Sequence, residues 1–138
     1  MTFCLTTTIV KPEMDIPIKN AVILLHGYGG DGKDIALLAS YWRTYITDTI
    51  FICPDAPEKC AASPNGFQWF DLMDQASEQI LAKSLVAENK LNKLIDEVKE
   101  KNNLKAIEIV IGGFSQGCMI TLQTGIKRKD KINSIIGY

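Results

Sequence analysis

Short runs of consecutive apolar residues recur along the chain, separated by segments in which apolar positions return every three or four residues. The runs predict strands, at residues 3–10, 21–25, 49–53, 107–111 and 132–137. The periodic segments predict helices, at residues 33–45, 75–101 and 116–127. Strands and helices that alternate in this way indicate an α/β fold, with a mostly parallel sheet and helices on both faces.

Two of the predicted strands, 21–25 and 49–53, are almost wholly apolar, so we expect both of their faces to be covered. The threonine-rich run 3–10 favours an edge strand. The long helix is expected to turn one apolar stripe into the core, formed by Ile80, Leu81, Leu85, Leu91, Leu94, Ile95 and Val98. Between these elements, residues 54–70 contain three prolines and are expected to form a loop, and a loop of this length in a compact domain is usually functional or mobile.

Length and composition narrow the class of protein. The chain has 138 residues, about one domain (1–138), with 46% hydrophobic residues and a net charge of −1, which does not indicate nucleic-acid binding. No signal peptide and no stretch of transmembrane length is evident. The four cysteines match no zinc pattern, so we expect no metal and no cofactor, and free thiols favour a cytoplasmic location. Cys53 and Cys118 are expected in the core, and the cluster Lys127-Arg128-Lys129 in solvent at a helix end.

The segment Gly113-Phe114-Ser115-Gln116-Gly117 is the most informative in the chain. It has the pattern G-x-S-x-G, and it follows the predicted strand 107–111 and opens the predicted helix 116–127. In that setting the pattern indicates a nucleophile elbow, a tight turn that exposes a serine hydroxyl above the end of the sheet. The alternative is that Ser115 only caps the helix. We therefore predict Ser115 as the catalytic nucleophile.

A second glycine-rich segment, residues 26–32, follows the predicted strand 21–25. Such a loop supplies one amide of the oxyanion hole in α/β-hydrolases, and the residue after the nucleophile supplies the other. We therefore expect the backbone amides of Tyr28 and Gln116 to serve as the donors. One alternative is a plain turn. Another is a dinucleotide-binding loop, because the segment also fits G-x-G-x-x-G and Asp55 lies near the end of the next strand.

The only histidine, His26, directly adjoins this loop and precedes Ser115 in the chain. The base of an α/β-hydrolase follows its nucleophile, so we expect His26 to be a structural imidazole that bonds nearby backbone. Trp69 and Phe70 either wall an acyl pocket or pack as ordinary loop residues, and we take them as candidate substrate-binding residues.

Together these segments resemble the phospholipase/carboxylesterase family, which includes the acyl-protein thioesterases. The resemblance rests on four strings in the same order and spacing: residues 24–32, 53–57, 69–71 and 111–117. It implies an α/β-hydrolase fold, Ser115 as nucleophile, Tyr28 and Gln116 as oxyanion donors, and Trp69-Phe70-Asp71 beside the acyl pocket. Two departures are Cys118, where the family usually has a small residue, and Tyr28, where it usually has leucine.

The resemblance further implies that this chain covers about the first two-thirds of the domain. Members of the family carry an Asp and then a His on loops after two further strands, and the counterparts of those strands lie beyond Tyr138. We therefore expect an incomplete sheet whose last strands are missing, and a domain that is truncated at its C-terminus.

The resulting expectation is a serine hydrolase of carboxylic esters or thioesters, of the carboxylesterase, lysophospholipase or acyl-protein thioesterase kind, acting through an acyl-enzyme. Its substrate is a small molecule or an acylated protein. The 138-residue chain itself is expected to be nearly inactive, and poorly stable because strand 132–137 exposes an apolar edge through which copies could associate. The alternatives are a non-catalytic remnant that binds an acyl ligand or a partner, and a dinucleotide-binding domain.

Overall fold

The computed structural model describes residues 1–73 and 76–138. Its elements are, in chain order, β1 (Thr7–Val10), β2 (Asn20–Leu25), α1 (Gly32–Trp42), β3 (Thr49–Pro54), β4 (Glu58–Lys59), β5 (Phe67–Gln68), α2 (Ser77–Asn102), a 3₁₀ turn (Ala106–Glu108), β6 (Ile109–Gly113), α3 (Gln116–Lys127) and β7 (Ser134–Gly137).

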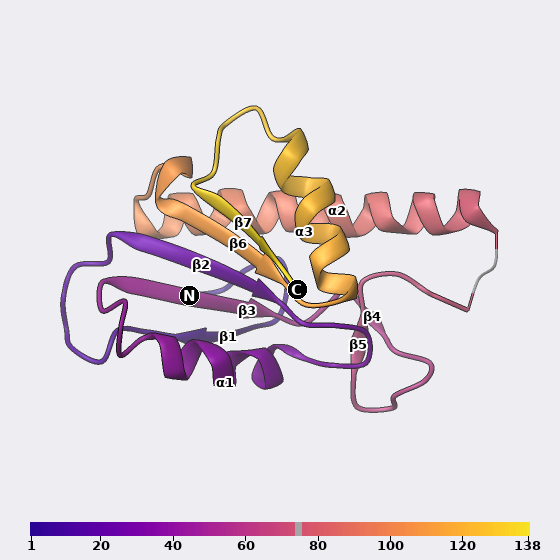
Figure 1. Cartoon of the computed structure of the whole chain (residues 1–138), viewed down its shortest axis with the longest axis horizontal. Helices are drawn as coiled ribbons and strands as arrows, with labels where there is room; N and C mark the ends of the chain where they lie inside the picture. The colour runs from indigo at the N-terminus through magenta and orange to yellow at the C-terminus, as the bar shows by residue number, and fades with distance from the viewer. Residues whose placement is uncertain (74–75) are drawn as a thin grey trace.

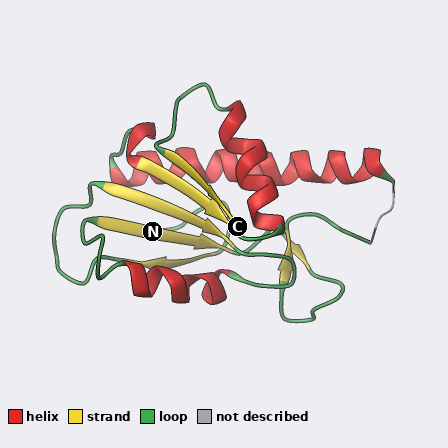
Figure 2. Cartoon of the chain, viewed as in Figure 1, coloured by secondary structure: helices red, strands yellow, loops and turns green. Residues whose placement is uncertain are grey.

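Five of the strands form one sheet in the order β1-β3-β2-β6-β7. The edge strand β1 runs antiparallel to β3, and the other neighbours pair in parallel. Helix α1 lies on one face of this sheet, and α2 and α3 lie on the other (Figures 1 and 2). The predicted α/β class, with a mostly parallel sheet and helices on both faces, is confirmed.

The central strands are buried on both faces because two hydrophobic cores lie on either side of them. Along β2, Ala21, Ile23 and Leu25 belong to the larger core beneath α2 and α3. The alternate residues Val22 and Leu24 belong to the smaller core beneath α1. This alternation follows from the two-residue period of a strand, and it explains why the sequence of β2 has no polar position in its centre.

Several predicted boundaries were wrong. The first strand is shorter than residues 3–10, and the segment 54–70 contains the small β4–β5 hairpin rather than only loop. Strand β6 begins at Ile109, two residues after the predicted start at residue 107. The reason is that residues 106–108 form a 3₁₀ turn, in which the Glu108 carboxylate accepts from the amide of Lys105 at 2.7 Å. The last strand begins at Ser134. The predicted start of the long helix at residue 75 lies outside the described residues.

The expected apolar stripe of α2 is buried only in its second half. Leu91, Leu94, Ile95 and Val98 are fully buried, whereas Leu81 is 58% exposed and Leu85 40% exposed. The prediction that both of these leucines belong to the core was wrong. The reason is length, because α2 has 26 residues and runs past the end of the sheet (Figure 1).

The basic cluster after α3 also differs from the prediction. The side chain of Arg128 is only 8% exposed, and it donates hydrogen bonds to Asp96 at 2.6 Å and to Asp130 at 2.9 Å. The bond to Asp96 attaches the end of α3 to α2, and the bond to Asp130 holds the loop that follows α3. Hydrogen bonding from Arg128 holds the pKa of Asp130 down at about 2. Only the neighbours Lys127 and Lys129 are exposed as expected.

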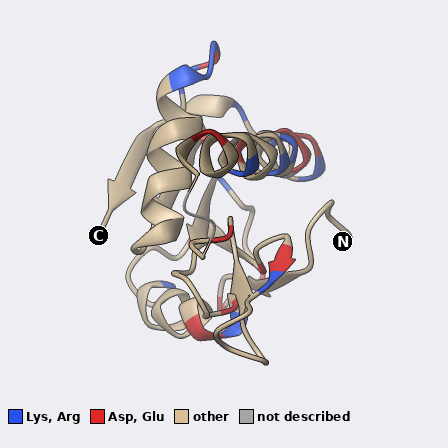
Figure 3. Ribbon diagram, turned by 90° about the vertical axis from the view of Figure 1, so that its right-hand side faces the viewer, with Lys and Arg blue, Asp and Glu red and all other residues tan. Residues whose placement is uncertain are grey.

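Of the two cysteines expected in the core, Cys53 is fully buried and Cys118 is only part-buried. None of the described helices carries an apolar stretch long enough to cross a bilayer. Acidic and basic residues are interspersed along the outer side of α2 (Figure 3).

Candidate active site

Ser115 stands at the junction between β6 and α3, with an exposed side chain. Its backbone has φ 54° and ψ −116°, a combination that side chains disfavour and that persists only where the surroundings enforce it. Two bonds do so. The amide of Ser115 donates to the carbonyl of Tyr138 at 2.9 Å, and the amide of Phe114 donates to the carbonyl of Leu25 at 3.0 Å. The turn is therefore fastened to β2 and to the end of β7.

The glycines on either side of the turn are required by the close approach of backbone. A methyl group on Gly113 would overlap the carbonyl of Gly117. A methyl group on Gly117 would lie 2.5 Å from the carbonyl oxygen of His26 and 2.6 Å from that of Leu25. This geometry explains the two fixed glycines of the G-x-S-x-G pattern, and it holds the first turn of α3 against the end of β2.

The glycine-rich loop lies directly against the elbow. A methyl group on Gly27 would lie 3.4 Å from the Cβ of Ser115 and 3.0 Å from the ring of Phe114. Within the described part of the chain, the amides of Tyr28 and Gln116 have no hydrogen-bond partner, whereas those of Gly29, Gly30 and Gly117 do. The structure thus brings the loop that carries Tyr28 against the nucleophile, and the use of the Tyr28 and Gln116 amides in catalysis stays a prediction.

His26 is engaged by backbone through both ring nitrogens. Its Nε2 accepts from the amide of Ala56 at 2.9 Å, so its Nδ1 carries the proton and donates to the carbonyl of Gly27 at 2.7 Å. The side chain is 2% exposed, and burial lowers its pKa below the ordinary value. The imidazole is therefore neutral and structural, as expected from its position in the chain, and neither nitrogen is free to take a proton from Ser115.

Trp69 and Phe70 are buried in the interior next to the elbow, whereas Ser115 itself is exposed. The Gln116 side chain accepts from the amide of Trp69 at 2.8 Å and donates to the carbonyl of Phe70 at 2.7 Å. The Trp69 indole donates to the carbonyl of His26 at 2.9 Å, and its ring is fully buried in the larger core. The role of both aromatics in substrate binding stays a prediction.

The side chain of Gln116 is a positioning element that the sequence did not reveal. It is 2% exposed and joins the elbow to the segment that carries Trp69. The motif fixes only that some residue stands between Ser115 and Gly117. Its partners lie more than forty positions earlier in the chain, so no local spacing could have indicated this contact.

The dinucleotide interpretation fits the structure poorly. Asp55 accepts from the amide of Gly32 at 2.8 Å, and Asp31 accepts from the amide of Asp34 at 2.8 Å. Both carboxylates thus occupy the N-terminus of α1, which is where a pyrophosphate would have to bind. Two negative charges in that place argue against an anionic ligand there.

Other reactive groups offer little at this site. An open hollow of about 260 Å³ adjoins the glycine-rich loop and is lined by Gly27, Tyr28, Asp34 and Phe114 among others. Burial raises the pKa of the Cys53 thiol to about 12, which excludes it as a nucleophile at neutral pH. Among the described residues, no group of side chains is placed to hold a metal ion. The chemistry of the site therefore centres on Ser115.

Comparison with known proteins finds similarity to acyl-protein thioesterases and to an esterase of known structure. The acyl-protein thioesterase 1 of Yarrowia lipolytica is 32% identical over 91% of this chain and 60% of its own length. That of Schizosaccharomyces pombe is 30% identical over the whole chain and 62% of its own length. The crystal structure of esterase PE8 is 33% identical and superposes with a TM-score of 0.88 over 96% of this chain and 64% of that one.

The carboxylesterase of Bacillus cereus shares the fold at 18% identity, with a TM-score of 0.73 over 97% of this chain and 59% of that one. This chain spans about three-fifths of the length of the curated relatives it matches. The model of the phospholipase/carboxylesterase family matches residues 6–138, nearly the whole chain. By this match and by its relatives, the chain belongs to the phospholipase/carboxylesterase family.

Proposed function

We propose that this chain supplies the nucleophile and the oxyanion hole of a serine hydrolase that cleaves carboxylic esters or thioesters. One observation supports the proposal above the others. Ser115 is held exposed in a strained turn, and the unpartnered amides of Tyr28 and Gln116 belong to the loop beside it and to the next residue. Unpartnered amides beside a nucleophile suit the negative charge that develops on a carbonyl oxygen during acyl transfer.

In the proposed reaction the hydroxyl oxygen of Ser115 attacks the acyl carbon of the substrate. The carbonyl oxygen becomes an oxyanion and accepts from the two amides, each of which is worth roughly 3–4 kcal/mol in such enzymes. The leaving alcohol or thiol departs with a proton, and water then hydrolyses the acyl-enzyme. A serine hydroxyl needs a general base for the first step, because it is a weak nucleophile at neutral pH.

His26 does not serve as that base, because backbone groups occupy both of its nitrogens. It is also the only histidine among the 138 residues. We therefore propose that this chain alone is nearly inactive and retains only the residual catalysis of an oxyanion hole, about 10³–10⁴ over water. Several relatives are named acyl-protein thioesterases, which supports acylated proteins as substrates beside small esters. The four free thiols support a cytoplasmic location.

A second candidate is a non-catalytic role in binding a partner or an acyl ligand. It is favoured by the half-exposed edge strand β7, through which copies of the chain could also associate. The two candidates differ in whether Ser115 can be acylated.

The test is reaction of the purified chain with a fluorophosphonate, followed by mass spectrometry of the labelled peptide. The proposal expects slow labelling confined to Ser115, no labelling of Ser115→Ala, and p-nitrophenyl butyrate hydrolysis close to background. Gly27→Val serves as a second variant, because its side chain would meet Phe114 and the loop could no longer approach the serine. Absence of Ser115 labelling under any condition would leave the binding role as the better account.

A further inference from the structure

Residues 67–70 contact both parts of the chain that carry the proposed oxyanion donors. This 67–70 segment begins as strand β5, which pairs with β4 in a separate two-stranded sheet beyond the carboxyl ends of β2 and β6 (Figure 1). One end of the segment is hydrogen-bonded to the glycine-rich loop that contains Tyr28, and the other end to the side chain of Gln116. The segment therefore joins two parts of the site that are far apart in the sequence.

At its first residue the segment is bound to the glycine-rich loop by two backbone hydrogen bonds. The carbonyl of Phe67 accepts from the amide of Gly29 at 2.9 Å, and the amide of Phe67 donates to the carbonyl of Gly30 at 2.8 Å. The preceding residue, Gly66, lies so close to the loop that a methyl group there would overlap the carbonyl of Gly29. Because these contacts are made by backbone, they fix the path of the loop itself.

The position of Gly30 in turn sets the direction of the Tyr28 amide. The amide of Gly30 donates to the carbonyl of Gly27 at 3.1 Å, and the Nδ1 of His26 donates to the same carbonyl at 2.7 Å. This carbonyl and the Tyr28 N–H belong to one planar trans peptide unit, in which they point in opposite directions. The bonds that hold the carbonyl therefore also aim the Tyr28 N–H, and Phe67 acts on it through Gly30.

The other end of the segment is bound to the elbow. The Gln116 side chain accepts from the amide of Trp69 and donates to the carbonyl of Phe70, and it is buried. The Trp69 indole also donates to the carbonyl of His26, at the start of the glycine-rich loop. Both aromatic side chains of the segment are buried in the larger core, so close packing restricts any movement of this end.

We propose that the 67–70 segment is a positioning element that sets the separation between the amides of Tyr28 and Gln116. This inference rests on the proposed function. An oxyanion hole needs its donors at about 2.7–3.1 Å from one oxygen atom. Tyr28 lies beyond the end of β2 at Leu25, where pairing with β6 no longer fixes the backbone. The segment supplies the missing constraint, because it holds the loop at one end and the elbow at the other.

The test compares the two amides in the whole chain, isotope-labelled for NMR and reacted with an alkyl fluorophosphonate. The phosphonyl oxygen of the Ser115 adduct takes the place of the oxyanion, so in wild type both amide proton signals should move downfield. Gly66→Ala forces the segment away from the glycine-rich loop and leaves the bonds to Gln116 in place. We expect this variant to lose the Tyr28 shift, keep the Gln116 shift, and label Ser115 at least about tenfold more slowly.

Two further variants separate positioning from a loss of stability. Val98→Ala removes buried atoms from α2 and changes none of the hydrogen bonds of the segment, so its labelling rate and both amide shifts should equal those of wild type. Gln116→Met keeps the backbone amide and the length of the side chain but loses the bonds to Trp69 and Phe70. Its labelling should also be at least about tenfold slower, and it serves as the test where Gly66→Ala does not fold.

The inference would be overturned if Gly66→Ala kept the Tyr28 shift, if it lost both shifts, or if Val98→Ala slowed labelling equally. Hydrogen exchange of the Gly29 amide in the unreacted chain measures the hold of the segment without any chemistry at Ser115. We expect slow exchange in wild type and Val98→Ala and fast exchange in Gly66→Ala, and equal exchange in all three would again overturn the inference. Absence of Ser115 labelling in wild type refutes the proposed function only, and hydrogen exchange then decides whether the segment positions the loop.

Discussion

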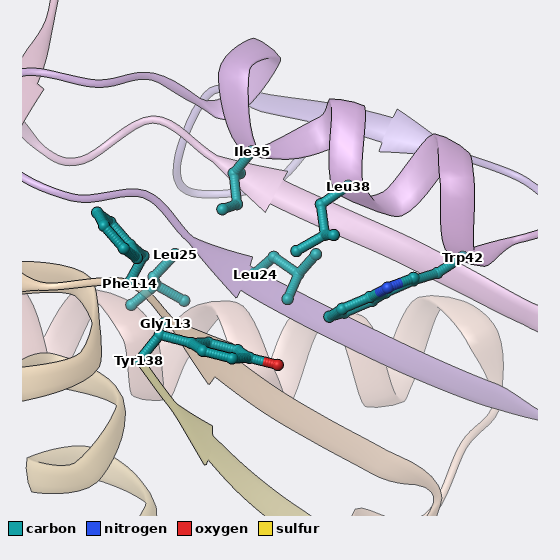
Figure 4. Close-up of a pocket in the computed structure, with 8 residues that line it drawn as sticks. All are labelled: Leu24, Leu25, Ile35, Leu38, Trp42, Gly113, Phe114 and Tyr138. Atoms are coloured by element: carbon teal, nitrogen blue, oxygen red, sulfur yellow. The ribbon is translucent and has the colours of Figure 1, made fainter.

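The two tryptophans lie in regions of opposite character. Trp69, behind the nucleophile, is fully buried and donates a hydrogen bond to backbone, whereas Trp42 forms the wall of an open groove. Behind Ser115 the contacts are short, largely to backbone, and made within this chain. The groove that Trp42 lines lies between α1 and the sheet, and its lining is almost wholly apolar (Figure 4). The nucleophile is therefore positioned by backbone contacts made within this chain, whereas the groove beside α1 is formed by apolar side chains alone.

We expect the largest difference in stability between the two regions when a methyl group is added to one glycine in each of them. Gly117→Ala places a methyl against the carbonyl oxygens of Leu25, the last residue of the central strand β2, and of His26, which follows it, and this backbone cannot retreat. The tightest contact of Gly112→Ala is with the end of the flexible Leu24 side chain, at 3.2 Å, and its contacts with Ile136 at 3.6 Å are ordinary van der Waals distances. We expect Gly117→Ala to destabilise by about 3 kcal/mol and Gly112→Ala by less than about 1 kcal/mol. Urea denaturation of the two variants measures the difference, and equal losses would contradict it.

Exchange of each tryptophan for phenylalanine compares the stability of the two regions by removing side-chain atoms instead of adding them. Trp69→Phe leaves a cavity and removes the donor to the carbonyl of His26. We expect a loss of about 2–3 kcal/mol, from the cavity together with the unpaired buried carbonyl. Trp42→Phe alters only the wall of the open groove and should cost less than about 1 kcal/mol. Thermal melts of both variants give the ranking, and a larger loss at Trp42 would mean that the groove is closed.

Relief of backbone strain provides a third test, in which the substitution is expected to raise the free energy of unfolding rather than lower it. Glycine adopts the backbone angles of Ser115 without steric cost, so Ser115→Gly should raise the free energy of unfolding by about 1 kcal/mol while it removes the nucleophile. The matched control is Asn103→Gly, at the end of α2, where φ 52° and ψ 45° are ordinary for a helix end. Calorimetry should show a clear gain only for Ser115→Gly. A destabilised Ser115→Gly would show that the turn is not strained.

The smallest expected effect concerns pH. Burial holds the pKa of His26 below its ordinary value, so the folded state favours the neutral ring. The associated stability is fully present above the unfolded pKa of about 6.5 and is lost as the pH falls through the lower, folded pKa. Melting temperatures at pH 7.5 and 5.5 should fall more for wild type than for His26→Gln, which has no titrating ring. Parallel pH profiles of the two proteins would contradict the assignment.

Local signals predicted the fold well because its main elements follow one another at short range. The apolar runs of β2 and β3 needed only burial on both faces to be recognised, and α3 was predicted at its observed bounds. Features set by distant contacts were missed. Arg128 is buried only because α2 brings Asp96 beside it, and Leu81 is exposed only because the sheet ends before the helix does.

In the candidate site too, features set by neighbouring residues were predicted, and features set by distant contacts were missed. Ser115, Tyr28 and Gln116 were predicted because their proposed roles depend on a strand, a tight turn and a helix in direct succession. The inward position of Trp69 depends on how a loop folds back on the elbow, and the sequence between residues 54 and 73 carries no signal for that path. The β4–β5 hairpin was missed for the same reason, since strands of two residues show no periodicity.

Helix α2 has a further consequence. Its 26 residues extend about 39 Å, whereas the five residues of β6 extend about 17 Å. The second half of the helix is anchored by Leu91 and Val98, and the first half projects beyond the sheet, with Leu81 and Val86 exposed. Amide hydrogen exchange should therefore divide this one helix into two stability units. Amides before Ala87 should exchange through local fraying, and those after Leu91 only when the whole domain opens.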